Sequence, residues 1–358
     1  MTPLLFTPTQ LGDLQLANRI VMAPMTRNRA EADGTPNALM AEHYGARADA
    51  GLIVAEGTWP EVAGQAYCRQ PGIETPAHVA GWRRVTDAVH QRGGRIVLQI
   101  MHGGRVGSAH IKPAGVPTVA PSALQARGEI WTDAAGMQPF DHPQALTTEQ
   151  VKEAIAEHRA AALRARDAGF DGVELHGTSG YLSMQFLSSH TNARQDAYGG
   201  NATARARFAF ECLAAMADAI GAGRVGLRLN PGNTYNDTAD EDSAATHAEL
   251  MRQARPLGLA YLHVMRASVD DIDAFALARA NFGGPLILND GFDGASAEAA
   301  LQAGEGEAIS FARHFIANPD LVQRLRAGLP LARFDRRTLY TAGAAGYTDY
   351  PLAATATA

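Results

Sequence analysis

The stretch AGFDGVELHGTSG (168–180) decides the fold, because it connects a helix pattern to a short apolar strand that ends on polar residues. The preceding segment, Thr147–Ala168, is rich in alanine and has the periodicity of a helix. Gly169 stands where the C terminus of a helix needs a residue with positive φ. The run DGVELH from Asp171 then reads as a buried strand, and it ends at His176. The sequence therefore predicts a helix, a tight turn, a strand and a loop in this order.

The same unit recurs along the chain. Seven further runs have the composition of a strand: RIVMAPM from Arg19, GLIVAEG from Gly51, GRIVLQIMH from Gly94, RVGLRLN from Arg224, LAYLHV from Leu259, PLILND from Pro285 and EAISFAR from Glu307. Other helix patterns cover Ala77–Arg92, Thr203–Ile220 and Asp240–Arg255. Thr147 and Gln150 have the spacing of a capping box, and Gly221 follows a helix as Gly169 does.

Strict alternation of strands and helices implies parallel strands joined by crossover helices. Eight strands favour a closed barrel over an open doubly wound sheet, which usually has fewer strands and often a glycine-rich dinucleotide turn after the first strand. Here Pro24-Met25-Thr26-Arg27 follows the first strand. We therefore expect one α/β domain over residues 1–358, a (β/α)₈ TIM barrel.

Two segments lie outside the repeated unit. The first eighteen residues are expected to cap the floor of the barrel. Residues 106–142, after the third strand, are rich in glycine, proline and serine and too long for an ordinary connecting loop. This insertion is predicted to form a lid over the mouth of the barrel.

Composition excludes several classes of protein. The net charge of −6 gives no general attraction to nucleic acid or to anionic membranes, and no apolar run approaches the length of a bilayer span. The N-terminal residues lack the basic start and long apolar stretch of a signal peptide, and two cysteines cannot build a disulfide framework. We expect a cytoplasmic protein with a small-molecule substrate and no nucleic-acid or membrane partner, either a monomer or a homodimer.

Polar residues interrupt the apolar runs at the strand ends, where barrel enzymes place their active sites. These residues are Thr26, Gln99, His102, His176, Arg228 and Arg313. Each has a structural alternative: Gln99 could fill a polar layer of the barrel, Arg228 could belong to a buried ion pair, and His176 could be a hydrogen-bonded core histidine. Six such residues on one rim favour a shared ligand.

The ends of strands seven and eight suggest a phosphate group, which barrels often bind there. They read Asn289-Asp290-Gly291-Phe292 and Ala312-Arg313-His314. Gly291 permits close approach of the backbone and Arg313 offers a fork of donors, although a plain turn and a surface arginine are the alternatives. Asp290 opposes an anion site unless its side chain points away.

The remaining strand-end residues suit a flavin. Gln99 can pair with the donor–acceptor edge of the pyrimidine ring, and Arg228 can stabilise the reduced, anionic flavin near N1 and O2. Thr26 can donate a hydrogen bond to O4.

Longer motifs resemble a known family. They are LGDLQLANRIVMAPMTRNRA from Leu11, GLIVAEGT from Gly51, GWRRVTDAVHQRGGRIVLQIMHGGR from Gly81, AGFDGVELHGTSGYLSMQFL from Ala168, TNARQDAYGG from Thr191, ARHFIANPDL from Ala312 and GYTDYP from Gly346. In order and spacing, the chain resembles the old yellow enzymes nearly end to end, in particular bacterial ene-reductases of the N-ethylmaleimide reductase type.

The resemblance implies a tightly bound, non-covalent FMN and NADPH or NADH as electron donor. It implies ping-pong reduction of electron-poor alkenes such as enones, nitroalkenes and maleimides. The implied FMN-binding residues are Pro24, Met25, Thr26, Gly57, Gln99, Arg228, Gly291, Phe292, Ala312 and Arg313.

The resemblance also implies substrate roles. Tyr181 matches the proton donor to Cα, and His176 matches the residue that grips the activating oxygen. Tyr67 and Tyr347 match aromatic walls of the substrate pocket, and Trp131 in the insertion is a weaker candidate for substrate contact.

Several positions depart from the family. Ser179 stands where relatives have Asn or a second His, which predicts a weaker grip on the activating oxygen, by about 1–3 kcal/mol. Met101 replaces a frequent Trp and should widen the pocket, and Gly103 replaces a bulkier residue. Ala312 and the pair Asn289-Asp290 replace small residues on the phosphate loops.

Three other functions stay open at this point. One is a specialised flavin-dependent tailoring reductase or isomerase with a narrow substrate. The second is a flavin-free barrel enzyme acting on a phosphorylated substrate, although no strand-end lysine is present for a Schiff base. The third is a non-catalytic flavin or steroid binder.

Overall fold

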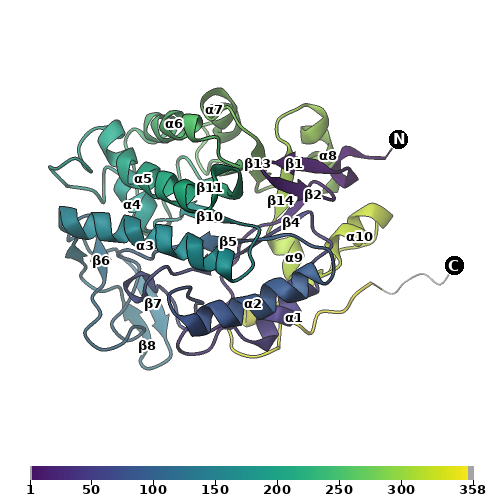
Figure 1. Cartoon of the computed structure of the whole chain (residues 1–358), viewed down its shortest axis with the longest axis horizontal. Coiled ribbons are helices and arrows are strands. Elements are labelled where there is room, and N and C mark those ends of the chain that lie inside the picture. Colours follow the sequence, from purple (N-terminus) through teal and green to yellow (C-terminus); the bar gives the residue numbers. More distant parts are fainter. Residues whose placement is uncertain (1, 354–358) are drawn as a thin grey trace.

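The computed structural model describes residues 2–353, and it contains a closed barrel of eight parallel strands (Figure 1). The barrel strands are β3 (Ile20–Met22), β4 (Leu52–Thr58), β5 (Ile96–Ile100), β10 (Gly172–Gly177), β11 (Val225–Leu229), β12 (Tyr261–Met265), β13 (Leu286–Asn289) and β14 (Ala308–Phe311). They are the eight runs expected from the sequence, paired in chain order with β14 closing on β3. The predicted TIM barrel is confirmed.

Helices surround the barrel because their buried faces are apolar and rich in alanine. They are α1 (Ala38–Gly45), α2 (Pro76–His90), α3 (Thr148–Asp167), α4 (Leu182–Leu187), α5 (Ala202–Ile220), α6 (Ser243–Ala254), α7 (Ala274–Asn281), α8 (Gly294–Gln302), α9 (Arg313–Ala317) and α10 (Leu321–Ala327). Short 3₁₀ turns are η1 (Leu4–Phe6), η2 (Val62–Gly64), η3 (Ala222–Arg224), η4 (Tyr235–Asp237), η5 (Arg255–Leu257) and η6 (Arg336–Thr338).

The predicted helix ends agree with the structure in most places. Thr147 accepts a hydrogen bond from the backbone of Gln150, whose side chain binds back to Thr147, so the capping box is formed. Gly169 and Gly221 have φ of 89° and 90°. The helix expected from Asp240 begins only at Ser243, because the preceding residues form a polar loop instead.

A glycine-rich run that leads into β11 has the spacing of a dinucleotide-binding turn but not its structural context. GAGRVG (221–226) has GxGxxG spacing, but it follows α5 and leads into β11 through η3. A dinucleotide turn instead follows a strand and opens a helix.

The N-terminal hairpin covers the floor of the barrel, as expected. Strands β1 (Thr9–Leu11) and β2 (Leu14–Leu16) are antiparallel, and their leucines pack in one apolar cluster with residues of six barrel strands. Gly12 at the turn has φ of 56°, and a Cβ there would lie 2.5 Å from the Gly223 carbonyl oxygen. The turn therefore requires glycine.

The insertion contains its own small sheets. Strands β7 (Glu129–Thr132) and β8 (Gly136–Pro139) form an antiparallel hairpin, while β6 (Val119–Ala120) pairs with β9 (Gln144–Ala145). Figure 1 shows the β7–β8 hairpin far from the β1–β2 cap, beyond the ends of the barrel strands. Movement of this segment as a lid stays a prediction.

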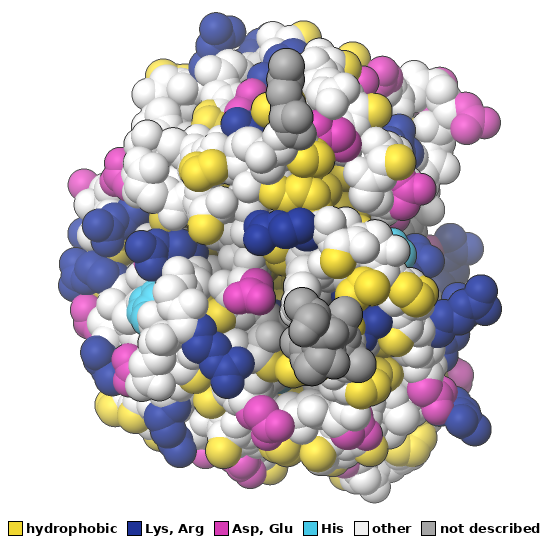
Figure 2. Space-filling model, turned by 90° about the vertical axis from the view of Figure 1, so that its right-hand side faces the viewer, with side chains coloured by type: hydrophobic (Ala, Val, Ile, Leu, Met, Phe, Trp, Pro, Cys, Tyr) yellow, Lys and Arg dark blue, Asp and Glu magenta, His cyan; other side chains and the backbone are white. Residues whose placement is uncertain are grey.

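The molecular surface carries both positive and negative side chains. Figure 2 shows basic and acidic side chains interspersed over one face of the molecule. Among residues 2–353, no helix is both long and apolar enough to cross a membrane.

Candidate active site

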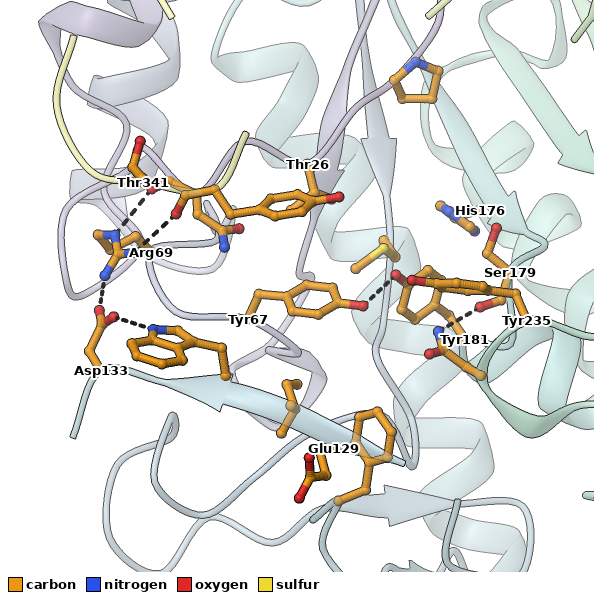
Figure 3. Close-up of a pocket in the computed structure, with 18 of the residues that line it drawn as sticks. Thr26, Tyr67, Arg69, Glu129, Asp133, His176, Ser179, Tyr181, Tyr235 and Thr341 are labelled. Atoms are coloured by element: carbon orange, nitrogen blue, oxygen red, sulfur yellow. Dashed lines mark hydrogen bonds and ion pairs between the residues drawn. The ribbon is translucent and has the colours of Figure 1, made fainter. Parts of the chain in front are cut away.

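Two adjoining cavities open where the barrel strands end. They have volumes of about 840 Å³ and about 490 Å³, and Pro24, His176 and Ser179 line both. The larger cavity, drawn in Figure 3, continues past Gln99 to the β7–β8 hairpin. The smaller one leads to Arg313. Because they share these residues, we describe them together as one elongated site with a wider part and a narrower part.

The smaller cavity contains the predicted phosphate loops. Gly291, Phe292, Ala312 and Arg313 all line it. Arg313 is exposed, and within residues 2–353 its guanidinium has no hydrogen-bond or ion-pair partner. Ala312 has φ of −97°, a conformation open to any L-residue, so the replacement of glycine there causes no strain.

Asp290 and Asn289, the other unusual residues of these loops, lie differently. Asp290 lines the smaller cavity, and its backbone has φ of 78°. Its side chain is exposed, so solvent screens its charge. Asn289 is buried, and its Oδ1 accepts a 2.7 Å hydrogen bond from Arg228. Asn289 therefore holds Arg228 of β11 at the cavity wall.

A buried polar network fixes Gln99 and Arg228 in the barrel. Gln99 donates to Glu174 at 2.8 Å, the ring of His263 contacts Glu174 at 2.9 Å, and Arg228 lies about 3 Å from the same ring. Burial alone would raise the pKa of Glu174, but His263 and Arg228 hold it below its ordinary value. Among residues 2–353, Arg228 forms no direct ion pair with a carboxylate, and its side-chain partners are His263 and Asn289. Gln99 and Arg228 each line one of the two cavities.

The N-terminal cofactor residues divide into two groups. Pro24 and Thr26 line the larger cavity. Met25 is half-buried and packs against the barrel core. Gly57 packs closely against Met101, because a Cβ on Gly57 would lie 2.6 Å from the Met101 sulfur. Neither Met25 nor Gly57 lines a described cavity. Their contact with FMN remains a prediction.

His176 and Tyr181 meet on the wall of the larger cavity. Their rings are perpendicular, with centroids 4.9 Å apart. The backbone N–H of Thr178 points at Nδ1 of His176 over 3.4 Å, which favours the tautomer with its proton on Nε2. Burial, reinforced by the charge of Arg228, lowers the pKa of His176 to about 3. His176 is therefore a neutral hydrogen-bond donor at physiological pH.

Tyr67 lies against Tyr181 at the same wall (Figure 3). The two phenol oxygens are 2.8 Å apart. Burial raises the pKa of Tyr67 to about 12 and that of Tyr181 well above its ordinary value, so both phenols are protonated. The predicted aromatic wall at Tyr67 is thus also a hydrogen-bonding partner of Tyr181.

Ser179 and Met101 line the cavity as predicted. Ser179 has φ of 57°, in the left-handed region that Asn and Gly adopt more readily. Its carbonyl oxygen accepts a 2.9 Å hydrogen bond from Asn236 on η4. Gly103 lies under the insertion, where a Cβ would meet the carbonyl oxygen of Val106 at 2.7 Å.

Tyr347, near the C terminus, and His102, after β5, do not line either cavity. Tyr347 is fully buried and lines neither cavity. Its ring stacks on His43 at 3.9 Å and packs against Arg27 and Arg29, so the expectation of a pocket wall is wrong for this structure. His102 is also buried, with Nε2 3.4 Å from Glu61, and has a structural place beside the insertion.

Thirteen residues that line the larger cavity were not predicted from the sequence. They are Asn28, Arg69, Glu129, Ile130, Asp133, Phe140, Tyr235, Asn236, Arg336, Arg337, Tyr340, Thr341 and Ala342. Tyr235 and Asn236 follow β11, so the strand-end rule extended past Arg228 could have found them. Trp131, the weaker candidate, does line the cavity, and its indole N–H donates to Asp133.

These features fit FMN. The elongated site has a free guanidinium at one end for a phosphate group, and a buried amide and a buried guanidinium beside the wider part for a polar ring edge. This arrangement would hold the phosphate at Arg313 and the pyrimidine edge between Gln99 and Arg228.

Comparison with known proteins points to the same cofactor. Residues 4–332 match the model of the NADH:flavin oxidoreductase / NADH oxidase family. A probable flavin mononucleotide-dependent alkene reductase of Leishmania infantum is 41% identical over 350 residues, with 96% of each chain covered. The structure of morphinone reductase in complex with tetrahydroNAD superposes with a TM-score of 0.95 at 41% identity, covering 99% of both chains. An old yellow enzyme homologue from Zymomonas mobilis gives a TM-score of 0.94 at 37% identity, covering 98% of this chain and all of its own.

The chain therefore belongs to the NADH:flavin oxidoreductase / NADH oxidase family as a member of the old yellow enzymes, and it is an FMN-dependent oxidoreductase.

Proposed function

We propose that the protein is an ene-reductase that reduces electron-poor C=C bonds of enones, nitroalkenes or maleimides with NADPH or NADH. The observation that carries the proposal is the pairing of a neutral histidine donor with a protonated phenol on one cavity wall, beside the residues suited to FMN. When bound, FMN supplies hydride transfer, first from the nicotinamide and then to Cβ of the alkene. We extend the proposal to a cytoplasmic enzyme that is a monomer or a homodimer.

Six residues would hold FMN. Arg313, with the backbone near Gly291, would bind the phosphate, and Gln99 and Arg228 would bind the pyrimidine edge. Pro24 and Thr26 line the wall between these ends. The network behind Arg228 keeps its guanidinium in place before the cofactor binds, so little reorganisation is needed.

His176 would donate from Nε2 to the carbonyl or nitro oxygen of the substrate. Negative charge grows on this oxygen as Cβ is reduced, so the hydrogen bond strengthens towards the transition state and lowers the barrier. A neutral donor suits this role, since an imidazolium this deeply buried would itself be costly.

Tyr181 would deliver the proton to Cα. Its ring edge packs against His176, so the proton donor and the oxygen-binding donor act on one substrate. Ser179 shares this wall and offers one short hydroxyl donor, while Met101 and Tyr67 shape its apolar side.

An anaerobic experiment with the FMN-loaded protein tests the proposal. NADPH should bleach the yellow flavin, and 2-cyclohexen-1-one added afterwards should restore the colour. A nitroalkene and N-ethylmaleimide should do the same. Bleaching without recovery by any of these three alkenes would reject the ene-reductase assignment while leaving the flavin assignment intact.

A further inference from the structure

The two phenols at the substrate wall come from separate parts of the chain. Tyr67 lies in the loop after η2, and Tyr181 immediately precedes α4. Their oxygens are 2.8 Å apart and their rings are nearly perpendicular, at 87°. Both line the larger cavity, but Tyr181 is buried whereas Tyr67 is partly exposed. Tyr67 is therefore the member of the pair with access to water.

The surroundings of Tyr181 make a lone phenolate there expensive. Its ring belongs to an apolar cluster with Met101, Ile130 and Phe140. Within residues 2–353, the only hydrogen-bonding partner of its hydroxyl is Tyr67. A buried anion without a partner is strongly disfavoured, so a Tyr181 that gave up its proton unaided would oppose the reaction it is meant to assist.

We propose that Tyr67 and Tyr181 form a two-phenol proton relay, in which Tyr67 protonates Tyr181 as Tyr181 protonates Cα of the substrate. This inference rests on the proposed ene-reductase function. It changes the role of Tyr67 from an aromatic wall to an acid that acts on the reacting phenol.

The relay balances in protons and electrons. The Tyr181 O–H bond breaks while the electron pair of the substrate enolate or nitronate forms the Cα–H bond. The Tyr67 O–H bond breaks while a new Tyr181 O–H bond forms, and the negative charge comes to rest on the Tyr67 oxygen. Solvent water then returns a proton to Tyr67 and leaves as hydroxide, and no further oxidant or reductant is needed.

The environment of Tyr67 suits the phenolate better. Burial raises the pKa of Tyr67 to about 12, while the hydrogen bond with Tyr181 and the nearby amide of Asn236 lower it. The pKa of Tyr181 is raised further, by burial and then by Tyr67. In the final state Tyr181 donates its hydrogen bond to the anionic oxygen of Tyr67, which stabilises the anion.

A proton inventory of enone-driven flavin reoxidation tests the relay. In wild-type enzyme, the rate in mixtures of H₂O and D₂O should curve with deuterium fraction, because two protons move in one step. In Tyr67→Phe the plot should become linear, and the rate with 2-cyclohexen-1-one should fall about tenfold, less than the 10²–10⁴-fold typical of losing the direct acid, because Tyr181 is still present. Reoxidation by ferricyanide, which protonates no carbon, should fall far less.

Matched variants separate the relay from simpler causes. Tyr340→Phe removes another phenol of the same cavity and should keep the curved plot. In protein labelled with ¹³Cζ-tyrosine, Tyr181→Phe should raise the pKa of Tyr67, because Tyr67 then loses its donor. A linear wild-type plot, or a Tyr67→Phe enzyme as fast as wild type, would overturn the relay. If instead Tyr181→Phe were as fast as wild type, the acid role of Tyr181 in the proposed function would fail.

Discussion

Replacing Ser179 with asparagine should make the enzyme a better enone reductase. Ser179 lies on the substrate wall with His176, and its φ of 57° is a conformation that Asn adopts at lower cost than Ser. The hydrogen bond from Asn236 uses the backbone carbonyl of residue 179, so it survives the change. The new amide N–H₂ reaches further into the cavity than the serine hydroxyl and can donate to the activating oxygen alongside His176.

The size of the gain follows from one added hydrogen bond. A neutral hydrogen bond contributes about 0.5–1.5 kcal/mol, which corresponds to about a two- to tenfold rise in kcat/KM. Because the oxygen gains charge during the reaction, the bond is stronger in the transition state than in the ground state. We therefore expect the change mainly in kcat rather than in KM.

The assay compares kcat and KM for 2-cyclohexen-1-one in wild type, Ser179→Asn and Ser179→Ala at saturating NADPH. The expected order of kcat is Asn, then Ser, then Ala. Thermal unfolding of the three proteins checks that the fold is intact, and Ala should be no more stable than Asn in the left-handed conformation. A well-folded Asn variant with kcat equal to or below that of wild type would refute the reasoning.

Three further perturbations have distinct readouts. Tyr181→Phe should slow flavin reoxidation by 2-cyclohexen-1-one by about 10²–10⁴-fold, the usual contribution of a general acid, and stopped-flow rates equal to wild type would remove it from that role. Arg313→Ala should weaken FMN binding by about 10–100-fold, because a hydrogen bond to a charged group contributes about 1.5–3 kcal/mol. Fluorescence titration of the apoprotein with FMN measures the affinity. An unchanged affinity would place the phosphate elsewhere. His158 is fully buried on α3, and burial lowers its pKa from the ordinary value of 6.5 to about 4. Between these two pH values, the unfolded chain therefore binds one more proton than the folded chain. Stability should therefore fall with falling pH in this window, and denaturant titrations of His158→Gln should show a pH slope smaller by about 1.4 kcal/mol per pH unit; an unchanged slope would contradict the buried, neutral histidine.

The sequence was most informative where chain direction and position decide the environment. Eight apolar runs sufficed for the barrel, and the strand-end rule found Thr26, Gln99, His176 and Arg228 because parallel strands bring their carboxyl ends to one rim. Tyr181 and Tyr67 came only from the resemblance to a family. The 2.8 Å contact between them joins two loops 114 residues apart, which no local pattern encodes.

The features that the sequence did not predict have a common physical origin. Tyr347 turned out to be buried because His43, Arg27 and Arg29 surround its ring, and these contacts depend on how the C-terminal segment folds back on the barrel. Asn289 does line the smaller cavity beside the predicted phosphate loops, but the hydrogen bond between its amide and Arg228 could not be predicted. Both depend on tertiary neighbours rather than on spacing along the chain.

The source of each hydrogen added to the alkene tests the central claim most directly. The wild-type enzyme is supplied with NADPH deuterated at the transferable nicotinamide position in H₂O, and separately with unlabelled NADPH in D₂O, both at saturating 2-cyclohexen-1-one. The nucleotide label should appear at Cβ of the product and the solvent label at Cα. Absence of nucleotide deuterium at Cβ, with the product still formed, would contradict it.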